Sequence, residues 1–481
     1  MSQKQQDSNA LAIAGIRRWI GNPLARRFIR FLITEDTCGN RLDTAIDLYI
    51  GIGHPEACIK CRFAGLLLQM IMQQSARIFG VDESQVRGGL QEPVFRKGLK
   101  NVLKGISDYG VTMPQKLDAP FLVVWDVTQQ CNLRCRHCYR DAGTALPGEM
   151  NTDDSCALID QLSDAGIAAL AFSGGEPLMR KDLVTLIARA KSHGLYVSVA
   201  SNGTLVTPEM AGRLRTAGMD YIEISVDGCD AATHDNFRGM PGVFSRTMEG
   251  IKNCVDAGIY TCIATTLTRE TWHQVDAIHA LGHDLGVQRM MIFNFIPTGR
   301  GADKEAQAKD LRPEEREALL KRIMALNETG EPPLILSTAP QFARVALQWE
   351  NGNGKGVPVG HFYAGDELAG PARTLAEFIG GCGAGRLYCS IEPEGDVQPC
   401  VFMPLVVGNV RERPFCEIWH TAPVLLQLRD RRELKGTCGT CRYRLVCGGC
   451  RARAWAYYGD LNAPDPGCIL NQQSWNALQP P

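Results

Sequence analysis

From residue 121 onward, short runs of apolar residues alternate with longer stretches in which apolar residues recur every three or four positions. A short run rich in Val, Ile and aromatic residues predicts a buried strand, and the longer pattern predicts an amphipathic helix. The predicted strands cover residues 121–126, 167–172, 195–200, 220–226, 260–267 and 288–296. The predicted helices cover residues 152–165, 182–193, 208–217, 243–257, 272–285 and 313–326.

Strand–helix units in succession predict a parallel sheet with helices outside it, because parallel strands need long crossover connections. Six predicted strands give an α/β fold class, a partial (β/α)6 barrel. A closed barrel needs two further strands, and the pattern shows none. Functional residues are expected at the carboxyl ends of the strands, where such barrels carry their chemistry.

The segments on either side of this region differ from it. Residues 1–118 predict a helical N-terminal domain of open role, and residues 119–330 hold the barrel. Residues 331–375, with Pro332-Pro333 and several glycines, predict connecting structure. Residues 376–481 are dense in cysteine and predict a small domain held together by metal. Arginines between positions 17 and 30 form a basic helical face. We interpret this face as exposed to solvent. The alternative is that it binds a membrane surface or an acidic partner.

Charge and hydropathy narrow the class of protein. The chain has 51 Lys and Arg against 52 Asp and Glu, so no basic field favours a nucleic acid partner. No apolar run is long enough to span a bilayer, and Arg17 and Arg18 interrupt the most apolar N-terminal stretch. We therefore expect a cytoplasmic protein. Its 19 cysteines are mostly clustered, which in a reducing compartment indicates metal or redox chemistry rather than structural thiols.

The first cysteine cluster directly follows the first predicted strand. Cys131, Cys135 and Cys138 form a C-x3-C-x2-C loop. Three thiolates on one loop can hold three irons of a four-iron cluster and leave the fourth iron open to a ligand. A structural zinc site needs a fourth protein ligand, and His137 lies poorly between Cys135 and Cys138 to provide it.

This loop, after the first strand of a βα barrel, resembles the radical S-adenosylmethionine (SAM) superfamily. The resemblance implies that SAM chelates the open iron and is cleaved reductively to a 5′-deoxyadenosyl radical, which abstracts hydrogen from a substrate. Cys131, Cys135 and Cys138 are then the catalytic cluster ligands. A low-potential electron donor such as ferredoxin or flavodoxin is implied as a partner.

Further motifs match the family's SAM site. The sequence Gly174-Gly175-Glu176-Pro177 follows the second strand and resembles the site for the SAM amino group. The resemblance gives further SAM-contact positions after the later strands and beside the last loop cysteine, namely Ser201, Asn202, Ser225, Arg238, His137 and Tyr139. The Arg238 fork suits the SAM carboxylate, although a surface position or a loop-holding salt bridge explains it equally well.

The C-terminal cysteines resemble the SPASM extension of radical SAM enzymes, which binds two auxiliary four-iron clusters. The resemblance implies one cluster on Cys382, Cys389, Cys400 and Cys450, and another on Cys438, Cys441, Cys447 and Cys468. With the radical cluster this makes three [4Fe–4S] clusters, and two zinc sites are the alternative for the auxiliary pair. The spacing Cys447-Gly-Gly-Cys450 departs from the family's usual C-x3-C, which puts the exchange of ligands between the clusters in doubt.

The motifs Cys447-Gly-Gly-Cys-Arg-Ala-Arg-Ala454 and Asp465-Pro-Gly-Cys468 resemble the alternative haem and haem d1 branch of the superfamily, which modifies tetrapyrrole side chains. A tetrapyrrole is therefore the first candidate substrate. A peptide or protein substrate, as for SPASM maturases, is the second candidate, and a non-catalytic iron–sulfur electron carrier is a third interpretation. Cys38, Cys58 and Cys61 can be read as structural thiols or as a further metal site, and Cys229 as an inert or an active-site thiol.

Overall fold

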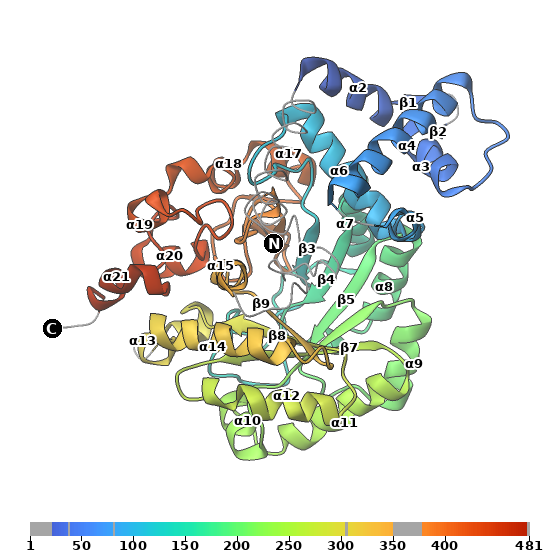
Figure 1. The fold of residues 1–481 in the computed structure, drawn as a ribbon. Helices are drawn as coiled ribbons and strands as arrows, with labels where there is room; N and C mark the ends of the chain where they lie inside the picture. The colour runs from blue at the N-terminus through green and yellow to red at the C-terminus, as the bar shows by residue number, and fades with distance from the viewer. Residues whose placement is uncertain (1–21, 37–38, 80–81, 304–305, 350–377, 479–481) are drawn as a thin grey trace.

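The structure is a computed structural model, and it describes residues 22–36, 39–79, 82–303, 306–349 and 378–478. One large sheet occupies its centre (Figure 1). Six neighbouring strands confirm the predicted parallel series: β3 (Leu122–Asp126), β4 (Ala169–Ser173), β5 (Tyr196–Ser201), β6 (Tyr221–Ser225), β7 (Tyr260–Leu267) and β8 (Arg289–Asn294).

The sheet contains two more parallel strands, which the sequence pattern missed. Strand β9 (Leu334–Ser337) pairs with β8, and β10 (Tyr388–Ile391) pairs with β3. The first lies in the segment expected to be connecting structure and the second in the cysteine-rich segment. Each has only four residues, too few to show a period. The two strands do not pair with each other, so the sheet stays an open, partial barrel.

The remaining strands are short. Strands β11 (Asp396–Gln398) and β12 (Gly408–Asn409) extend the sheet in antiparallel fashion beyond β10. Strands β1 (Glu35–Asp36) and β2 (Gly39–Asn40) form a separate hairpin near the N-terminus.

Helices cover the outer face of the sheet, as predicted (Figure 1). They begin at residues with helix-starting chemistry: Asn151 caps the first by accepting a hydrogen bond from the amide of Asp154, and two others have proline in their first turn. The series is α7 (Thr152–Ala165), α8 (Leu183–Ser192), α9 (Pro208–Thr216), α10 (Ala231–Arg238), α11 (Val243–Asp256), α12 (Val275–Asp284), α13 (Ala306–Lys309), α14 (Pro313–Asn327) and α15 (Gln341–Gln348).

Alternation along the strands creates both the core and a hollow. In β5, Val197 and Val199 point outward and are fully buried against the helices. Such a side chain contributes about 1.5–3 kcal/mol on burial. Ser198 and Ala200 point inward, where they line a cavity. Small inward side chains on neighbouring strands therefore leave the barrel interior unfilled.

The N-terminal helices pack around an apolar cluster of their own, which includes Leu42, Ile46 and Leu68. Part of the basic face is used internally, since Arg26 donates hydrogen bonds to the carbonyl oxygens of Ser107 and Asp108. Arg17 and Arg18 lie outside the described residues. The helices of this region are α2 (Pro23–Ile33), α3 (Arg41–Ile50), α4 (Ile59–Phe79), α5 (Glu83–Gly89) and α6 (Pro93–Tyr109).

The C-terminal region lies on the opposite side of the molecule in Figure 1. Helix α17 (Phe415–Thr421) packs Phe415 and Trp419 into the same core as the barrel strands, so this region is continuous with the sheet. Its helices are α17 (Phe415–Thr421), α18 (Pro423–Leu428), α19 (Gly436–Thr440), α20 (Arg451–Tyr458) and α21 (Gln472–Asn476).

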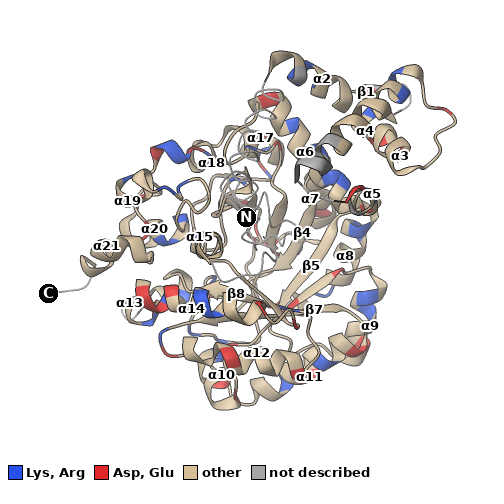
Figure 2. Cartoon of the chain, in the orientation of Figure 1, with Lys and Arg blue, Asp and Glu red and all other residues tan. Residues whose placement is uncertain are grey.

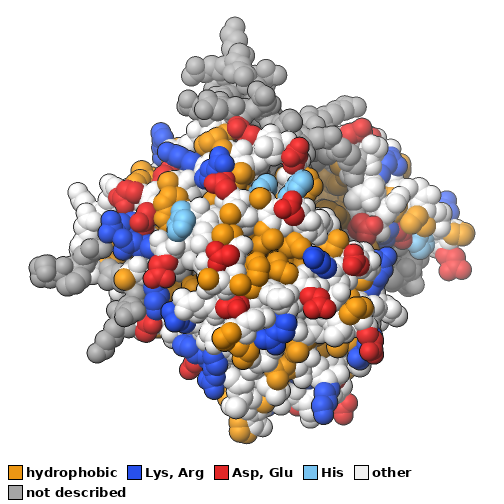
Figure 3. Space-filling view, turned by 90° about the horizontal axis from the view of Figure 1, so that it is seen from below, with side chains coloured by type: hydrophobic (Ala, Val, Ile, Leu, Met, Phe, Trp, Pro, Cys, Tyr) orange, Lys and Arg blue, Asp and Glu red, His pale blue; other side chains and the backbone are white. Residues whose placement is uncertain are grey.

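Charged side chains lie mainly on the outer helices, and the central strands carry few (Figure 2). The face seen from below mixes both signs of charge around a central group of apolar side chains (Figure 3). Within the described residues, no helix has the length and apolar character that a membrane span requires.

Candidate functional site

A cavity of about 570 Å3 occupies the interior of the partial barrel. Inward side chains of the parallel strands form its wall, and the loop that carries Cys131, Cys135 and Cys138 lies at its edge. The segment around Tyr388 and Phe402 from the C-terminal region closes another side. The cavity therefore touches both cysteine-rich parts of the chain.

The three loop cysteines lie close enough for their charges to act on one another. Burial raises the pKa of Cys131 to about 11, so a bound metal is needed to keep this thiol ionised. Arg300 holds the loop from outside by donating to the carbonyl oxygens of Cys135, at 2.9 Å, and Ala142, at 2.6 Å. The structure thus brings together the three residues that the sequence predicted as cluster ligands.

Gly174 and Gly175 pack directly against the backbone that leads into this loop. The amide of Gly175 donates to the carbonyl oxygen of Thr128 at 2.7 Å. A Cβ on Gly174 would clash with that same oxygen, and a Cβ on Gly175 would clash with the carbonyl group of Gln130. These glycines also line the cavity, so they both support the cysteine loop and face the predicted SAM position.

Glu176 is fully buried behind the cavity wall rather than in it. Its carboxylate accepts hydrogen bonds from the Ser201 hydroxyl and the Asn202 amide, both at 2.8 Å. Burial raises the pKa of Glu176, while these donors act in the opposite direction. Ser201 and Asn202 do line the cavity. Glu176 therefore holds two predicted contact residues in place.

Arg238, at the end of α10, is buried beside the cysteine loop. Its guanidinium lies 2.5 Å from the carboxylate of Asp227 and 3.6 Å from the sulfur of Cys135. The surface interpretation is therefore wrong, and a loop-holding salt bridge is present. Its Nε has no hydrogen-bond partner among the described residues, and the side chain lines the cavity. The salt bridge is thus compatible with a further anionic ligand.

Two aromatic side chains next to Cys138 have different surroundings. Tyr139 lines the cavity, and its hydroxyl lies 3.1 Å from both Asp126 and Ser173. His137 stacks on Phe237 with ring centroids 4.1 Å apart, and burial holds its pKa well below the usual range. Ser225, at the end of β6, lines the cavity as expected for a strand-end residue.

The sequence pattern missed several residues that shape the site. Asp126 ends β3, and burial raises its pKa to about 6. Glu223 lies on β6 two residues before Ser225, faces the cavity and accepts a hydrogen bond from Tyr221 at 3.0 Å. Arg300 follows Gly299, whose positive φ of 56° lets it pack on the Tyr139 carbonyl. The position of Asp126 at the end of a predicted strand could have identified it from the sequence. For Arg300, the available indication was the Gly-Arg pair that follows the sixth predicted strand.

The C-terminal cysteines divide into two groups. Cys382, Cys400 and Cys450 all act electrostatically on the hydroxyl of Tyr388. Cys438, Cys447 and Cys468 act on one another, and Cys441 ends helix α19, three residues after Cys438. The left-handed residues Gly448 and Gly449 turn the chain between Cys447 and Cys450, which places these two cysteines in different groups.

The buried arginines around these cysteines test whether anionic metal clusters fit here. Arg386, Arg429, Arg431 and Arg451 are at most 6% exposed, and none forms a salt bridge with a carboxylate among the described residues. Burial lowers the pKa of Arg431 to about 10 and also lowers the pKa of Arg386. An unpaired buried cation is costly. Thiolate-ligated clusters would supply the missing negative charge, so the residues fit them.

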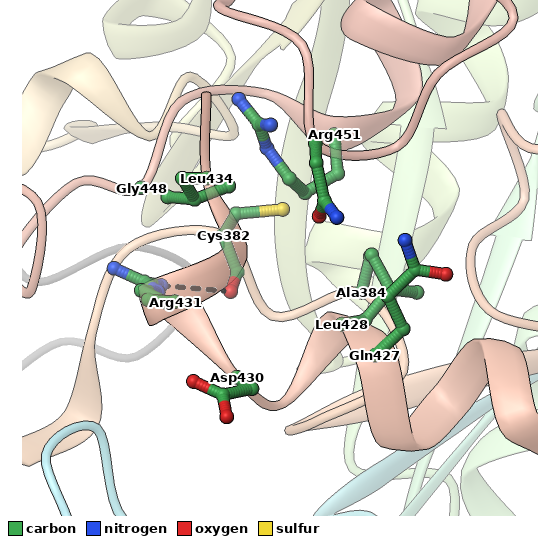
Figure 4. A pocket seen from close by; sticks show the side chains of 10 residues that line it. Cys382, Ala384, Gln427, Leu428, Asp430, Arg431, Leu434, Gly448 and Arg451 are labelled. Atoms are coloured by element: carbon green, nitrogen blue, oxygen red, sulfur yellow. Dashed lines mark hydrogen bonds between the residues drawn. The ribbon is translucent and has the colours of Figure 1, made fainter. Parts of the chain in front are cut away.

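Cys382 lies near two of these arginines, Arg431 and Arg451 (Figure 4). Its side chain borders a small cavity of about 10 Å3, together with Arg431 and Arg451. Arg431 donates to its carbonyl oxygen at 3.2 Å. Within the described residues, no three His, Cys, Asp or Glu side chains converge on one metal ion. A four-iron cluster does not require such convergence, because each cysteine thiolate binds a different iron of the cluster.

Cys389 is the one predicted auxiliary ligand that the structure places elsewhere. It is fully buried in the apolar core of the barrel, on β10 opposite Val123 of β3. Among the described residues, Arg429 is the charged group that affects the pKa of the Cys389 thiol, and none of the other cysteines does so.

Comparison with known proteins agrees with this geometry. Residues 125–281 match the radical SAM superfamily, and residues 382–442 match an iron–sulfur cluster-binding domain, SPASM. The chain is 37% identical over 353 residues to the AdoMet-dependent heme synthase of Methanosarcina barkeri, covering 73% of this chain and 97% of that one. It belongs to the radical SAM superfamily. The corresponding synthase of Nitratidesulfovibrio vulgaris is 40% identical, over 72% of this chain and 91% of its own length.

A solved structure shares the overall fold. The crystal structure of Streptococcus suis SuiB bound to S-adenosylmethionine aligns over 89% of this chain and 93% of its own, with a TM-score of 0.62 and 16% identity. Family membership makes this chain an enzyme that uses SAM and [4Fe–4S] clusters for radical chemistry. The interpretation as a non-catalytic electron carrier is therefore wrong.

Cys58, Cys61 and Cys229 do not line the cavity. Cys58 and Cys61 have sulfurs 3.5 Å apart at the start of α4, and Cys38 lies outside the described residues. Cys229 is near Asp230, with 3.7 Å between sulfur and carboxylate, and does not line the cavity. The further metal site therefore stays a prediction.

Proposed function

We propose that this radical SAM enzyme modifies the side chains of a carboxylated tetrapyrrole. The cavity carries this proposal. At about 570 Å3 it lies within the range of about 300–1,000 Å3 that small-molecule sites occupy. It reaches from the loop of Cys131, Cys135 and Cys138 to the auxiliary cysteine region, and the relatives named as heme synthases support the same substrate class.

The lining suits a flat aromatic ligand. Tyr221 and Tyr260 form a tilted pair with ring centroids 5.8 Å apart, and Tyr139 and Phe402 form an edge-on pair with centroids 5.3 Å apart. Aromatic rings favour offset or edge-on contacts with other π systems. Arg289, whose Nε donates a hydrogen bond to the Tyr260 hydroxyl at 2.7 Å, adds a cation at the start of β8. A substrate carboxylate can pair with such a guanidinium.

The chain's residues have distinct roles in this proposal. Cys131, Cys135 and Cys138 hold the cluster, and Gly174 and Gly175 let the backbone approach the SAM amino group. Ser201, Asn202 and Ser225 contact the polar parts of SAM, and Glu176 positions the first two of these. Arg238 holds Cys135 in place and brings a positive charge to the SAM carboxylate, while Tyr139 borders the adenine. When bound, SAM and its cluster supply the 5′-deoxyadenosyl radical that abstracts hydrogen from the substrate.

We propose three [4Fe–4S] clusters in all, one radical and two auxiliary. The two groups of C-terminal cysteines and the unpaired buried arginines support the auxiliary pair. A low-potential donor such as ferredoxin or flavodoxin would supply electrons. A location in the cytoplasm and the absence of a nucleic acid partner remain predictions.

The test is anaerobic reconstitution followed by iron and sulfide analysis and assay of 5′-deoxyadenosine with dithionite. About twelve irons per chain are expected, and about eight in the Cys131/Cys135/Cys138→Ala variant, which should release no 5′-deoxyadenosine. The Cys254→Ala variant, which changes a fully buried cysteine of α11, is the matched control and should behave as wild type.

Substrate class is tested with coproporphyrin III, free and with iron, as the probe. Binding should shift its main absorption band. Turnover should give a product lighter by carbon dioxide and two hydrogens for each side chain modified, because one hydrogen goes to the 5′-deoxyadenosyl radical, one leaves as a proton, and the remaining electron passes to an iron–sulfur cluster. SAM cleavage without tetrapyrrole binding would instead support the peptide alternative. Zinc in place of iron would overturn the radical proposal.

A further inference from the structure

Strand β10 places two neighbouring residues on opposite faces of the sheet. Tyr388 lines the cavity, and its hydroxyl lies 2.8 Å from the sulfur of Cys400. Cys389 follows it, and side chains alternate along a strand. The register with β3 agrees: Cys389 lies opposite Val123, which is in the helix-covered core, whereas Tyr388 lies opposite Leu122, which lines the cavity. Cys389 therefore points away from Cys400.

The surroundings of Cys389 are those of a packed core. It shares the apolar cluster with Ile391, Phe415 and Trp419, and none of its surface is exposed. Arg429, the nearby cation, already donates to the carbonyl oxygens of Gly385 and Trp419. A cluster on this face would have to separate the sheet from α17 and α18. Close packing of such a core makes that change costly.

The three other predicted ligands lie on the cavity side. Cys400 and Cys450 are buried in one apolar cluster, with Cys382 packed against it. Tyr388 lies close enough to all three cysteines to interact with them electrostatically, and Cys382 interacts in the same way with Cys400 and Cys450. The carboxylate of Asp465 acts on the Cys450 thiol, but it already accepts hydrogen bonds from Gln341 and from the backbone amide of Cys450. It also pairs with Arg453.

The cavity reaches the positions next to these cysteines. Gly381 and Gly383 on either side of Cys382, and Val401 after Cys400, all line it. The three cysteines themselves do not line the cavity, so a metal held at this group would lie directly behind this part of the cavity wall.

We propose that this auxiliary cluster is held by Cys382, Cys400 and Cys450 alone, and that its fourth iron faces the cavity and takes an exogenous oxygen ligand. The ligand is water or a carboxylate of the substrate. The inference rests on the proposed function, because it assumes that this group of cysteines binds a cluster. Cys389 has a packing role, and Tyr388 donates a hydrogen bond to the Cys400 thiolate.

Iron content tests the ligand set. The Cys131/Cys135/Cys138→Ala variant serves as background, so that only auxiliary clusters are counted. Adding Cys389→Ala should leave about eight irons per chain, as should Cys254→Ala, the matched buried control, whereas adding Cys400→Ala should leave about four. Loss of about four irons in both Cys389→Ala and Cys389→Val, with Cys254→Ala unaffected, would overturn the proposal. Two substitutions at position 389 separate ligand loss from a packing defect.

The open iron has its own spectroscopic test. In the dithionite-reduced background variant, 13C-cyanide should add a hyperfine coupling to the cluster signal, and 17O-water should broaden it. Loss of the 17O effect on adding iron coproporphyrin identifies a substrate carboxylate as the ligand, and its persistence identifies water. Absence of both the 13C and 17O effects in a variant that holds about eight irons contradicts the open iron. A background variant with no iron would instead contradict the auxiliary clusters themselves.

Discussion

Arg238 and Asp227 form a buried ion pair in which the guanidinium lies 2.5 Å from the carboxylate. Asp227 is completely buried just beyond β6, and its carboxylate also accepts from the amide of Thr266 on β7. The pair thereby ties the end of α10 to the sheet and brings a cation beside Cys135. Two strands and one helix thus fix a group next to the cluster loop.

Asp227→Ala should leave the Arg238 guanidinium buried without its partner. Removal of one member of a buried pair costs about 3–5 kcal/mol, so we expect the free energy of unfolding to fall by about that amount. Anaerobic urea titration measures it. Asp256→Asn, on the exposed end of α11, is the control and should change the free energy little. An effect of Asp227→Ala no larger than that of the control would contradict the buried-pair account.

Gly175→Ala should displace the cysteine loop, because its Cβ would overlap the carbonyl group of Gln130. We expect poor retention of the radical cluster, with iron falling by up to about four per chain, and loss of 5′-deoxyadenosine release. Gly212→Ala in α9 meets nothing within 4 Å and should keep full iron content. Equal iron contents in the two variants would show that the glycine is not needed for the loop.

His234 should make stability depend on pH. Burial lowers its pKa to about 4, and its Nδ1 accepts from the amide of Asp227 at 3.2 Å. The unfolded histidine has a pKa near 6.5. The unfolded chain therefore binds more protons between about pH 4 and 6.5, and stability should fall by about 3 kcal/mol as the pH is lowered through this window. Urea titrations of the apoprotein should show a shallower fall in His234→Phe.

Ala169→Phe should fill part of the barrel cavity without reaching the SAM residues. Ala169 begins β4 and lines the cavity, four residues before Ser173. We expect SAM cleavage with dithionite to persist, while coproporphyrin binding weakens about tenfold or more, a loss of about 1.4 kcal/mol. Absorption titration measures the binding. Ala232→Phe, exposed on α10, is the control, and unchanged binding in both would place the substrate elsewhere.

Arg386→Met should affect the apoprotein and the reconstituted enzyme in opposite directions. Two nitrogens of this buried guanidinium have no hydrogen-bond partner among the described residues. Without clusters, its removal should raise the free energy of unfolding by about 1–3 kcal/mol. With clusters bound, removal of the cation should lower stability and the reduction potential of the nearby cluster. Thermal unfolding of both forms and a redox titration check this, and a gain in both forms would contradict the charge-pairing account.

The sequence by itself determined the local chemistry. The C-x3-C-x2-C loop and the C-terminal cysteines are recognisable because their spacing along the chain sets which sulfurs can share a site. The six central strands were predictable because their helix-covered positions hold apolar residues such as Val197 and Val199, in short runs between helical patterns. The positions of Ser201 and Ser225 followed from these strands, since both residues lie where a strand ends.

Only the tertiary structure decided which of these residues face one another. Four-residue strands such as β9 and β10 carry no period, and partners distant in sequence stabilise them. The face that Cys389 occupies depends on the register of β10 with β3, which a shift of one residue would reverse. The ion pair of Asp227 and Arg238 likewise joins a strand end to a helix end. Spacing therefore identifies the cysteines, whereas strand register and packing decide which of them can reach the cavity.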